Sequence, residues 1–560
     1  MCGIAGVARA GPYDSSVLES LGRKMAASLA HRGPDGEGLW VNEAAGLVLA
    51  HRRLAIIDPS PAGAQPMADA SGRYTIVYNG ELYNYRELRR ELEARGTVFR
   101  SSSDTEVLLE LYAREGDQCL GRLNGMFAFA VWDAQERELT LVRDALGIKP
   151  LYYAEQDAGF LFASELKTIV PHLAARTPDV TALARYLTYL WCPGEGTPLR
   201  EVRKLAPGEA LAVRAGRIAR RWTWYRLPAA RGVVPSRMTS GEAVHRVHAR
   251  LRAAVRRQLV ADVPVGAFLS GGLDSSAVVA LAREAVPDLR CFTIELGGGQ
   301  DAGFADDLPY ARRVAAHLGV RLEVVTVEAR HMAQDVPEMV SQLDEPLADP
   351  AALNVRYISE LARQQGVPVL LSGAGGDDLF TGYRRHRLLA TEPIWGWWPQ
   401  GARSALAALA QRLPAMIGWG RRAHAAARLL AAPADERRIV AFEWLARERV
   451  ASLFAPEWRA QLADPAEPMR SFEHTLSPEV PPFERLLALE QRFFLADHNL
   501  AYTDRMSMAA GVEVRVPYLD AELVELAARL PAEYKQRGRT GKWVLKEAMR
   551  GALPGEVIDR

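Results

Sequence analysis

Two short segments carry the residues with the clearest chemical potential, and the first lies at the amino terminus. The chain begins Met1-Cys2-Gly3-Ile4, so a thiol lies next to the chain end. Removal of Met1 is expected before a residue as small as cysteine, and would leave the Cys2 thiol beside a free α-amine. That amine titrates at about 8, so it can accept the thiol proton without a histidine partner. The sequence therefore predicts a cysteine nucleophile, although a single second-position cysteine is usually just a small buried side chain.

The second segment is Ser270-Gly-Gly-Leu-Asp-Ser-Ser276, which combines glycines, hydroxyls and a carboxylate. It lies between a predicted strand and a predicted helix, where backbone N–H groups and the helix N-terminus can bind phosphate. The alternative is an ordinary tight turn between strand and helix. A second glycine and carboxylate cluster, Leu371-Ser-Gly-Ala-Gly-Gly-Asp-Asp-Leu-Phe-Thr-Gly-Tyr383, follows another buried strand and favours a nucleotide site.

The elements that must position these residues change in character along the chain. Residues 1–215 contain short β-prone runs with two helical stretches, around 84–95 and 104–116, which predicts an α+β domain of layered antiparallel sheets with helices. An arginine-rich stretch at 216–240 is predicted to be a linker. From 241 to 560 strands alternate with helices, which predicts an α/β domain with a parallel sheet. Its predicted strands include Val263–Leu269, Cys291–Glu295 and Val367–Leu371, and a helix is expected from Ser275 to Ala285.

A tryptophan-rich stretch at about 393–433 stands out within the second domain. It contains Trp395, Trp397, Trp398 and Trp419 among alanine, leucine and arginine. A membrane-surface or partner-docking helix pair is one interpretation. We favour the other, a helical insertion that packs on the second domain.

Composition restricts the class of protein. The chain has 560 residues, is 49% hydrophobic and has a net charge of +1, which gives no electrostatic footprint for nucleic acid. Its four cysteines, Cys2, Cys119, Cys192 and Cys291, are too few and scattered for a disulfide framework or a zinc site, and suit a reducing compartment. No apolar run reaches the roughly 18 residues of a membrane span, and no signal peptide is apparent. We predict a cytoplasmic enzyme.

Four further motifs follow Cys2 in order: His31-Arg-Gly-Pro-Asp-Gly36, His51–Asp58, Tyr78–Asn84 and Ser103–Glu106. This series resembles the class II, N-terminal nucleophile glutamine amidotransferases. The resemblance implies that Arg53 binds the glutamine α-carboxylate, Asp104 its α-amine, and Glu81 helps to hold the substrate. Asn79 and the Gly80 amide would form the oxyanion hole. Taken singly, Asn79-Gly80 could be a hairpin turn and Asp104 a helix cap.

The segment at 270–276 resembles the PP-loop of ATP pyrophosphatases. The resemblance implies that Asp274 and Asp377 hold Mg²⁺ on the phosphates, as hard oxygen ligands suit a hard cation. Leu269 and Ile294 would line the adenine pocket. The other residues implied to lie near ATP are Ser270, Gly271, Gly272, Ser275, Ser276, Ser372 and Gly373.

A class II glutaminase followed by a PP-loop domain is the layout of glutamine-hydrolysing asparagine synthetases, which the chain resembles over nearly its whole length. The resemblance implies that ATP activates an acceptor carboxylate as an adenylate, with release of pyrophosphate, and that ammonia from glutamine crosses an internal tunnel to attack it. It is also compatible with a homodimer. Asp344-Glu-Pro346, Asp349-Pro350, Asp504–Met508 and Val512–Asp520 extend the match.

Two departures from this pattern bear on the acceptor. Asparagine synthetases typically have glutamate after Ser-Gly in the second loop, whereas this chain has Ala374, which cannot accept a proton. The family resemblance makes aspartate the first acceptor to consider, but Ala374 puts it in doubt, and a sugar uronic acid or a peptide is the alternative. The family pattern also continues into a lysine-bearing, glycine-rich segment; either it lies beyond residue 560, which we favour, or the synthetase site is incomplete.

Three other classes share only part of this pattern. Phosphoribosyl-pyrophosphate or fructose-6-phosphate amidotransferases would have Cys2 but lack the loop at 270–276. A PP-loop enzyme that modifies tRNA would have the loop but should show a basic face. A non-catalytic relative would not need Cys2, Asp274 and Asp377 together.

Overall fold

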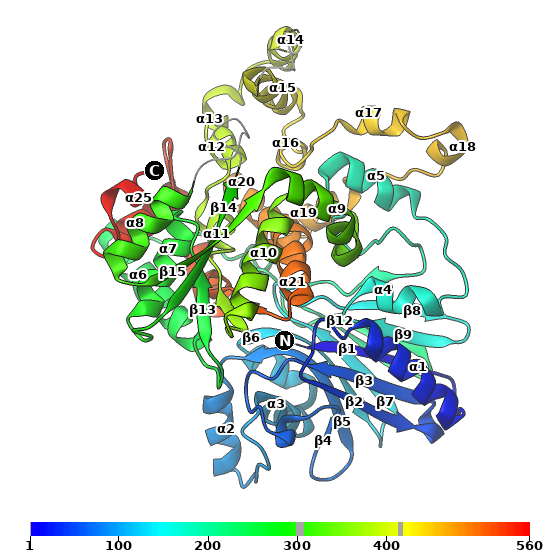
Figure 1. The fold of residues 1–560 in the computed structure, drawn as a ribbon. Helices are drawn as coiled ribbons and strands as arrows, with labels where there is room; N and C mark the ends of the chain where they lie inside the picture. Colours follow the sequence, from blue (N-terminus) through cyan, green and yellow to red (C-terminus); the bar gives the residue numbers. More distant parts are fainter. Residues whose placement is uncertain (1, 298–306, 411, 413–417) are drawn as a thin grey trace.

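The N-terminal part consists of two stacked antiparallel sheets with helices on both outer faces (Figure 1). The structure, a computed structural model, describes residues 2–297, 307–410, 412 and 418–560. The first sheet has the order β10 (Arg203–Lys204), β8 (Tyr152–Gln156), β9 (Gly159–Ala163), β1 (Gly3–Ala8), β3 (Leu47–Arg53) and β2 (Gly36–Asn42). The second has the order β12 (Arg217–Thr223), β11 (Glu209–Arg214), β7 (Glu138–Arg143), β6 (Gly125–Asp133), β5 (Tyr74–Leu82) and β4 (Met67–Ala68).

Strand β6 shows why strands of the second sheet appear in the sequence as continuous apolar runs. Ala128 and Ala130 face the first sheet, whereas Phe127, Phe129 and Val131 belong to the cluster on the opposite face. Successive side chains of a strand point to opposite faces, so a strand covered on both sides needs apolar residues at every position. The outer helices are α1 (Ser15–Ser28) and α4 (Leu166–Ile169) on the first sheet, and α2 (Tyr85–Ala94) and α3 (Asp104–Glu115) on the second. The predicted α+β fold and its two helices are confirmed.

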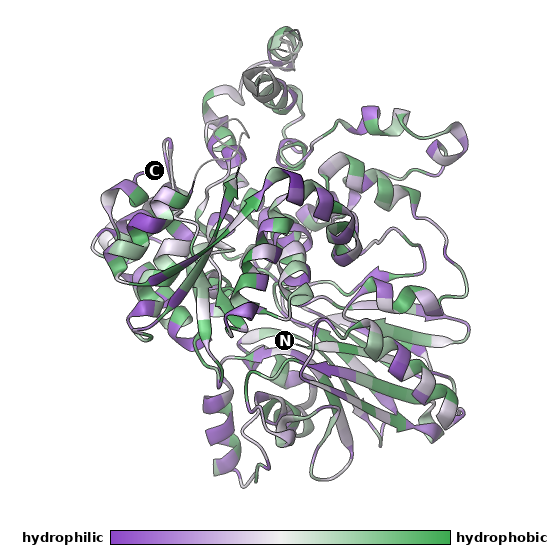
Figure 2. Ribbon diagram, in the orientation of Figure 1, coloured by the Kyte–Doolittle hydropathy of each residue, from purple (hydrophilic) through white to green (hydrophobic). Residues whose placement is uncertain are grey.

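The C-terminal part is built on a five-stranded parallel sheet, as predicted. Its order is β15 (Arg321–Glu328), β14 (Arg290–Gly297), β13 (Val265–Phe268), β16 (Val369–Leu371) and β17 (Glu513–Arg515). Figure 2 shows these strands as largely hydrophobic. The helices around it include α6 (Ser240–Gln258), α7 (Leu273–Arg283), α8 (Leu308–Leu318), α9 (Ala329–Leu343), α10 (Ala351–Gln364), α11 (Gly376–Phe380), α12 (Arg384–Ala390), α22 (Ala521–Arg529) and α24 (Trp543–Met549).

The strands after β13 are added first on one side of it, as β14 and β15, and then on the other side, as β16 and β17. Ligands of open parallel sheets bind at such a switch point, beyond the carboxyl ends of the strands. The loops at 270–276 and 372–377 follow β13 and β16 directly. The fold therefore brings the two glycine-rich loops to the position where a nucleotide would bind.

Helices α20 (Pro482–Leu489) and α21 (Leu500–Ala509) flank η7 (Glu490–Asn499), a ten-residue π-helix. π-Helical turns are rare and occur often at functional sites. Its side chains include Gln491, which donates to the backbone carbonyl of Asp378 at 3.4 Å. This helix thus contacts the second glycine-rich loop.

The predicted linker at 216–240 is partly wrong. Residues Arg217–Thr223 form β12, which pairs with β11 at the edge of the second sheet. Its arginines Arg217, Arg220 and Arg221 pair with acidic residues at the surface. Charged residues are usual on an edge strand, where they discourage pairing with another chain, and here they imitate the composition of a linker.

The tryptophan-rich stretch is helical, but most of it does not pack on the second domain. It forms α13 (Glu392–Trp395), α14 (Gln400–Ala410) and α15 (Gly418–Ala431), and α14 and α15 pack on each other. They project from the body of the molecule at the top of Figure 1, far from the N-terminal sheets. Among the described residues, no helix is long and apolar enough to cross a membrane.

Candidate functional site

Cys2 lies directly before β1, and its side chain is buried. Its backbone nitrogen donates to Asn79 Oδ1 at 3.0 Å, while the Asn79 Nδ2 group has no hydrogen-bond partner among the described residues. Burial raises the pKa of the Cys2 thiol, and the positive charge of Arg53 and the Leu54 backbone N–H oppose that rise. Met1 lies outside the described residues, so the expectation of its removal stays a prediction.

Asn79 and Gly80 lie inside β5, so the hairpin-turn alternative is wrong. Gly80 pairs with Phe127 of β6, and a Cβ atom at Gly80 would lie 2.2 Å from the Met126 carbonyl oxygen. Only glycine allows β5 and β6 to approach this closely. The position of Asn79 beside Cys2 therefore depends on the glycine that follows it.

Asp104 is buried at the start of α3, but Ser103 is the residue that caps the helix. The Asp104 carboxylate instead accepts hydrogen bonds at Oδ2 from the Tyr78 hydroxyl at 3.1 Å and the Leu82 N–H at 2.9 Å. The interpretation of Asp104 as a mere helix cap is therefore wrong. Burial raises the pKa of Asp104 to about 6 despite these donors.

Arg53 and Glu81 both lie close enough to Cys2 for their charges to act on the pKa of its thiol, Arg53 lowering it and Glu81 raising it. The Arg53 guanidinium donates to the backbone carbonyls of Ser60, at 2.8 Å, and of Asp58. Glu81 is buried, and one of its oxygens lies 3.6 Å from the Arg515 guanidinium of the C-terminal part. Of the five residues predicted from the glutaminase motifs, Asn79, Arg53 and Glu81 thus lie near Cys2, Gly80 lies between Asn79 and Glu81 in β5, and Asp104 is bound to Tyr78 and Leu82 of the same strand.

His51 is not a candidate base for the thiol. Its ring is buried and lies 3.3 Å from the Tyr78 carbonyl oxygen. Burial lowers its pKa to about 3, so the imidazole is neutral at physiological pH.

The loop at 270–276 is held by its own serines. The hydroxyls of Ser270 and Ser275 lie 2.9 Å apart, and Ser275 Oγ also accepts from the Ser270 N–H at 3.2 Å. Gly271 has φ +74°, and a Cβ there would lie 2.4 Å from the Ala311 nitrogen. Gly272 precedes α7 without a side-chain cap, so the first N–H groups of the helix are free to bind an anion.

The two glycine-rich loops touch each other. A Cβ at Gly373 would lie 2.6 Å from the Ser275 nitrogen, and one at Gly376 would lie 2.5 Å from Asp274 Cγ. Ser372 donates its N–H to the Arg515 carbonyl at 2.8 Å. Leu269 is fully buried at the end of β13, and Ile294 lies on the adjacent β14. The structure therefore brings together the residues predicted to lie near ATP.

Asp274 and Asp377 share one cation in the structure, the Lys542 ammonium. Its Nζ lies 2.6 Å from Asp274 Oδ2 and 2.7 Å from Asp377 Oδ1. Burial raises the pKa of Asp274 to about 7, although the Lys542 charge opposes the rise. Lys542 itself lies in the left-handed region at φ +55°, directly before α24.

The same donor set suits Mg²⁺. Two carboxylates close enough to share one ammonium can share a divalent cation, and Asp274 Oδ1 is buried without a hydrogen-bond partner in the described structure. Within the described residues no group of three or more His, Cys, Asp or Glu side chains forms a dedicated metal cage. Mg²⁺ usually binds through one or two carboxylates together with substrate phosphates, so these residues fit it.

Ala374 lies half-buried against the hydrophobic core, and its N–H donates to Ser372 Oγ at 3.2 Å. The loop's second carboxylate, after Asp377, is Asp378, which is buried and accepts from the Tyr383 hydroxyl at 3.4 Å. Burial and the neighbouring Glu490 and Asp377 charges raise the Asp378 pKa. Tyr383 also accepts from Asn499 of the π-helix at 3.0 Å.

The N-terminal and C-terminal parts are joined by buried charges at the Cys2 side of the interface. Arg32 donates to the Cys2 carbonyl at 3.1 Å and pairs with Asp504 of α21 at 2.9 Å. Asp504 also lies 3.4 Å from the Lys149 ammonium, and all three side chains are almost completely buried. Arg515 makes a second link, since its side chain reaches Glu81 while its backbone carbonyl accepts from Ser372.

Five residues of these sites had no role predicted from the sequence. Four of them lie inside motifs named above (Arg32, Tyr78, Asp504 and Arg515), and the fifth, Lys542, lies outside them in Gly541-Lys542-Trp543. Its two carboxylate partners, however, lie 268 and 165 positions away in the chain, so no local pattern pairs them.

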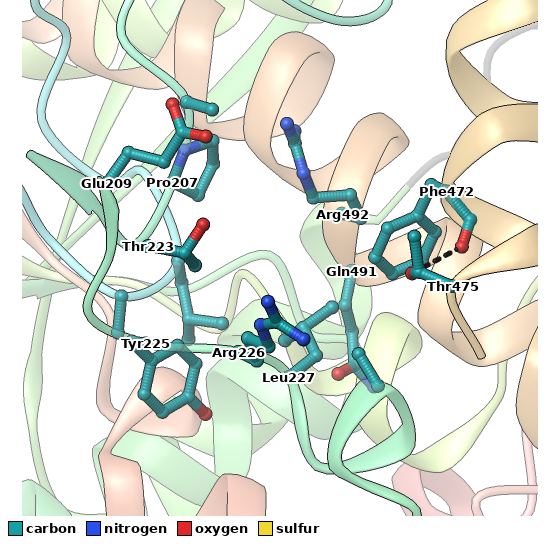
Figure 3. Close-up of a pocket in the computed structure, with 14 residues that line it drawn as sticks. Pro207, Glu209, Thr223, Tyr225, Arg226, Leu227, Phe472, Thr475, Gln491 and Arg492 are labelled. Atoms are coloured by element: carbon teal, nitrogen blue, oxygen red, sulfur yellow. Dashed lines mark hydrogen bonds between the residues drawn. The ribbon is translucent and has the colours of Figure 1, made fainter. Parts of the chain in front are cut away.

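A separate cavity of about 260 Å³ lies between the two parts and contains none of the predicted site residues. Figure 3 shows Arg226 and Arg492 beside it, together with Tyr225 and Phe472. Its wall includes Gln491, which contacts Asp378.

A buried N-terminal thiol site joined by charged contacts to a PP-loop site defines a glutamine-dependent amide ligase with two catalytic domains. Comparison with known proteins gives the same class: the family description "Glutamine amidotransferase domain" matches residues 1–225, and "Asparagine synthase" matches residues 246–560. Asparagine synthetase [glutamine-hydrolyzing] 1 of Bacillus subtilis is 32% identical over all of this chain and 86% of its own length. Asparagine synthetase [glutamine-hydrolyzing] 3 of the same organism is 31% identical over the same shares.

The chain belongs to the glutamine-hydrolysing asparagine synthetase family, as its motifs predicted. Among solved structures, the glutamine phosphoribosylpyrophosphate amidotransferase of Bacillus subtilis is 17% identical, with a TM-score of 0.31, over 67% of this chain and 82% of its own. Such a low score adds no argument to the fold described above. The chain is an ATP-using carbon–nitrogen ligase that takes its nitrogen from glutamine.

Proposed function

We propose that this enzyme amidates an acceptor carboxylate through an acyl-adenylate, with aspartate as the first acceptor and a sugar uronic acid or peptide as the second candidate. The observation that carries the proposal is the pairing of the two sites: Cys2 lies against Asn79, Asp274 and Asp377 surround one cation, and Arg515 contacts both regions. Family membership favours aspartate. Ala374 favours the second candidate, because it removes a carboxylate from the acceptor side of the loop.

In the glutaminase half, Cys2 Sγ would attack the glutamine carboxamide carbon. The nitrogen now held 3.0 Å from Asn79 Oδ1 would be the free α-amine after loss of Met1, and it would take the thiol proton. The unpaired Asn79 Nδ2 group and the Gly80 N–H would stabilise the oxyanion. Cleavage of the C–N bond releases ammonia and leaves a thioester, which water hydrolyses to glutamate.

The α-amine and α-carboxylate of glutamine would be bound by the two charged groups beside Cys2. Asp104 offers a buried carboxylate fixed by Tyr78 and Leu82, which suits an ammonium. Arg53 offers a guanidinium to the substrate carboxylate, and Glu81 completes the pocket.

In the synthetase half, the acceptor carboxylate would attack the α-phosphorus of ATP, and pyrophosphate would leave. Ser270, Ser275 and the free N–H groups at the start of α7 would bind the phosphates, with Leu269 and Ile294 beside the adenine. When bound by Asp274 and Asp377, Mg²⁺ supplies charge neutralisation of the phosphates. Lys542 would contribute a second positive charge at the same place.

Ammonia would then reach the adenylate within the protein, and its attack on the acyl carbon would expel AMP. The cytoplasm is the compartment we propose for this reaction, because a working thiol needs reducing conditions. Cys2, Cys119, Cys192 and Cys291 are all free thiols.

The test is pyrophosphate release with ATP and glutamine, measured with aspartate and with a panel of uronic acids and short peptides. We expect amide formation with one acceptor class, and hydroxylamine should trap the adenylate as a hydroxamate. The Cys2→Ala variant should lose glutamine use but keep synthesis from free ammonia, whereas Asp274→Ala should lose pyrophosphate release. Loss of the ammonia-dependent reaction in a folded Cys2→Ala variant would contradict the division between the two sites.

A further inference from the structure

The projecting helices around α14 differ from the rest of the surface. We call α13, α14 and α15, with the described residues that join them (392–410, 412 and 418–431), the Trp hairpin. Five of the fourteen large apolar side chains that are exposed in the described structure lie in it, within 16 consecutive positions. They are Ile394, Trp397, Trp398, Leu406 and Leu409, of which Trp397 is 76% exposed.

Helix α14 buries its charged side chain and exposes apolar ones. Its single charged residue, Arg403, is buried and donates to the backbone carbonyls of Trp398, at 3.1 Å, and Leu430, at 3.0 Å. The side chains that α14 exposes are uncharged, and the larger ones are Leu406 and Leu409. A surface helix of a globular protein normally turns its charged face outward. The outer face of α14 is therefore suited to an apolar environment.

The charge of this segment is also unusual. Between residues 392 and 431 the sequence has five arginines, no lysine and one acidic residue, Glu392, so this stretch carries +4 and the remaining chain −3, within a total of +1. Arg403 donates to backbone carbonyls and to the Gln400 side-chain oxygen, Arg428 donates to backbone carbonyls, and Arg412 is exposed. The carboxylate of Glu392 pairs with Arg437 outside the stretch, so it does not neutralise these arginines.

We propose that the Trp hairpin docks this enzyme on the surface of an anionic lipid bilayer. Tryptophan is enriched at the membrane interface, where its ring lies at the headgroup level and neighbouring arginines face anionic lipids. Trp397 is suited to this position because its indole N–H already donates to the Ile394 carbonyl at 2.8 Å. The hairpin projects from the body in Figure 1, so it can contact a flat surface without obstruction by the N-terminal sheets.

A second copy of the chain is a poorer partner for this face. Symmetric pairing would bring two segments of charge +4 together, and like charges across an interface oppose association. An anionic bilayer has the complementary charge, and the attraction falls off within a Debye length. Charge complementarity thus selects the bilayer.

The experiment is vesicle flotation of the full chain with phosphatidylcholine vesicles that either contain or lack phosphatidylglycerol. We expect at least tenfold more protein on the anionic vesicles and release by high salt. The variant Trp397→Ser, Trp398→Ser should lose at least tenfold of this binding and retain pyrophosphate release. The matched control is Trp458→Ser on α18 (Pro456–Arg459), because Trp458 is 37% exposed, like Trp398, but lies outside the hairpin.

Three outcomes would overturn the proposal. The first is equal binding of the wild type and the double variant to anionic vesicles, and the second is no binding of the active wild type. The third is a concentration-dependent dimer, seen by sedimentation velocity, that the double variant abolishes while vesicles bind neither form. In that case the hairpin is a self-association surface.

Discussion

At the scale of single residues, the carboxylate of Asp104 sets a pH limit on glutamine binding. Its pKa is raised to about 6 by burial, so the group is ionised above that pH and neutral below it. An α-ammonium needs the ionised form. We therefore expect the affinity for glutamine to fall by about tenfold per pH unit as the pH drops below 6.

This prediction is best measured by calorimetry on the Cys2→Ala variant, which binds glutamine without hydrolysing it. Tyr78→Phe in the same background removes the 3.1 Å hydrogen bond to Asp104, so the loss of affinity should begin at a higher pH. Affinity that stays constant through the acid range in both proteins would show that Asp104 does not bind the ammonium.

The sequence was sufficient to predict those site residues whose neighbours lie in the same motif. Asn79 and Gly80 belong to one motif, and the structure places Asn79 beside Cys2, while Asp104 of a later motif is fixed by Tyr78 and Leu82 of the same strand. It was insufficient for Lys542, because pairing with Asp274 and Asp377 depends on how β13, β16 and α24 pack. Long-range contacts of this kind leave no periodic pattern in a sequence.

At the scale of elements, the contact between the two glycine-rich loops depends on the start of α11. The Gly376 backbone lies so close to Asp274 that an added Cβ would meet its carboxylate at 2.5 to 2.8 Å. We expect Gly376→Ala to displace that carboxylate and to lower the rate of pyrophosphate release at least about tenfold, since a displacement of about 1 Å in a catalytic group can cost more.

Glutamine hydrolysis by Gly376→Ala should stay near the wild-type rate, because the substitution is in the other domain. Gly551→Ala is the matched control, as nothing lies within 4 Å of a Cβ at that position. Equal rates of pyrophosphate release for the two variants would mean that the Asp274 position tolerates displacement.

Most elements could be predicted because their burial is complete. The strands β6, β13, β14 and β16 are covered on both faces, so each appears in the sequence as a short apolar run. The wrong predictions concern surface elements whose composition is unusual for their position. The edge strand β12 has the composition of a linker, and α14 exposes apolar residues and buries its arginine. Only the packed structure shows that β12 is a strand and not a linker, and that α14 exposes its apolar face.

At the scale of the whole molecule, the two catalytic domains are connected by buried charges rather than by a flexible linker. Asp504 of α21 lies between Arg32, which also bonds to the Cys2 carbonyl, and Lys149. A shift of α21 would therefore be transmitted to the backbone of the nucleophile. Arg515 provides a parallel connection from Glu81 to the Ser372 amide.

Asp504→Asn should weaken this connection while keeping the shape of the side chain. It leaves Lys149 and Arg32 with less compensating charge, and breaking a buried pair costs about 3 to 5 kcal/mol, so the melting temperature should fall. We expect the folded variant to hydrolyse more glutamine for each amide formed, whereas its ammonia-dependent synthesis changes little. Asp559→Asn, which removes an exposed pair with Arg550, is the control and should alter neither quantity. If Asp504→Asn lowers both glutamine- and ammonia-dependent synthesis equally, with an unchanged ratio of glutamine to product, the buried charges stabilise the fold without coupling the sites.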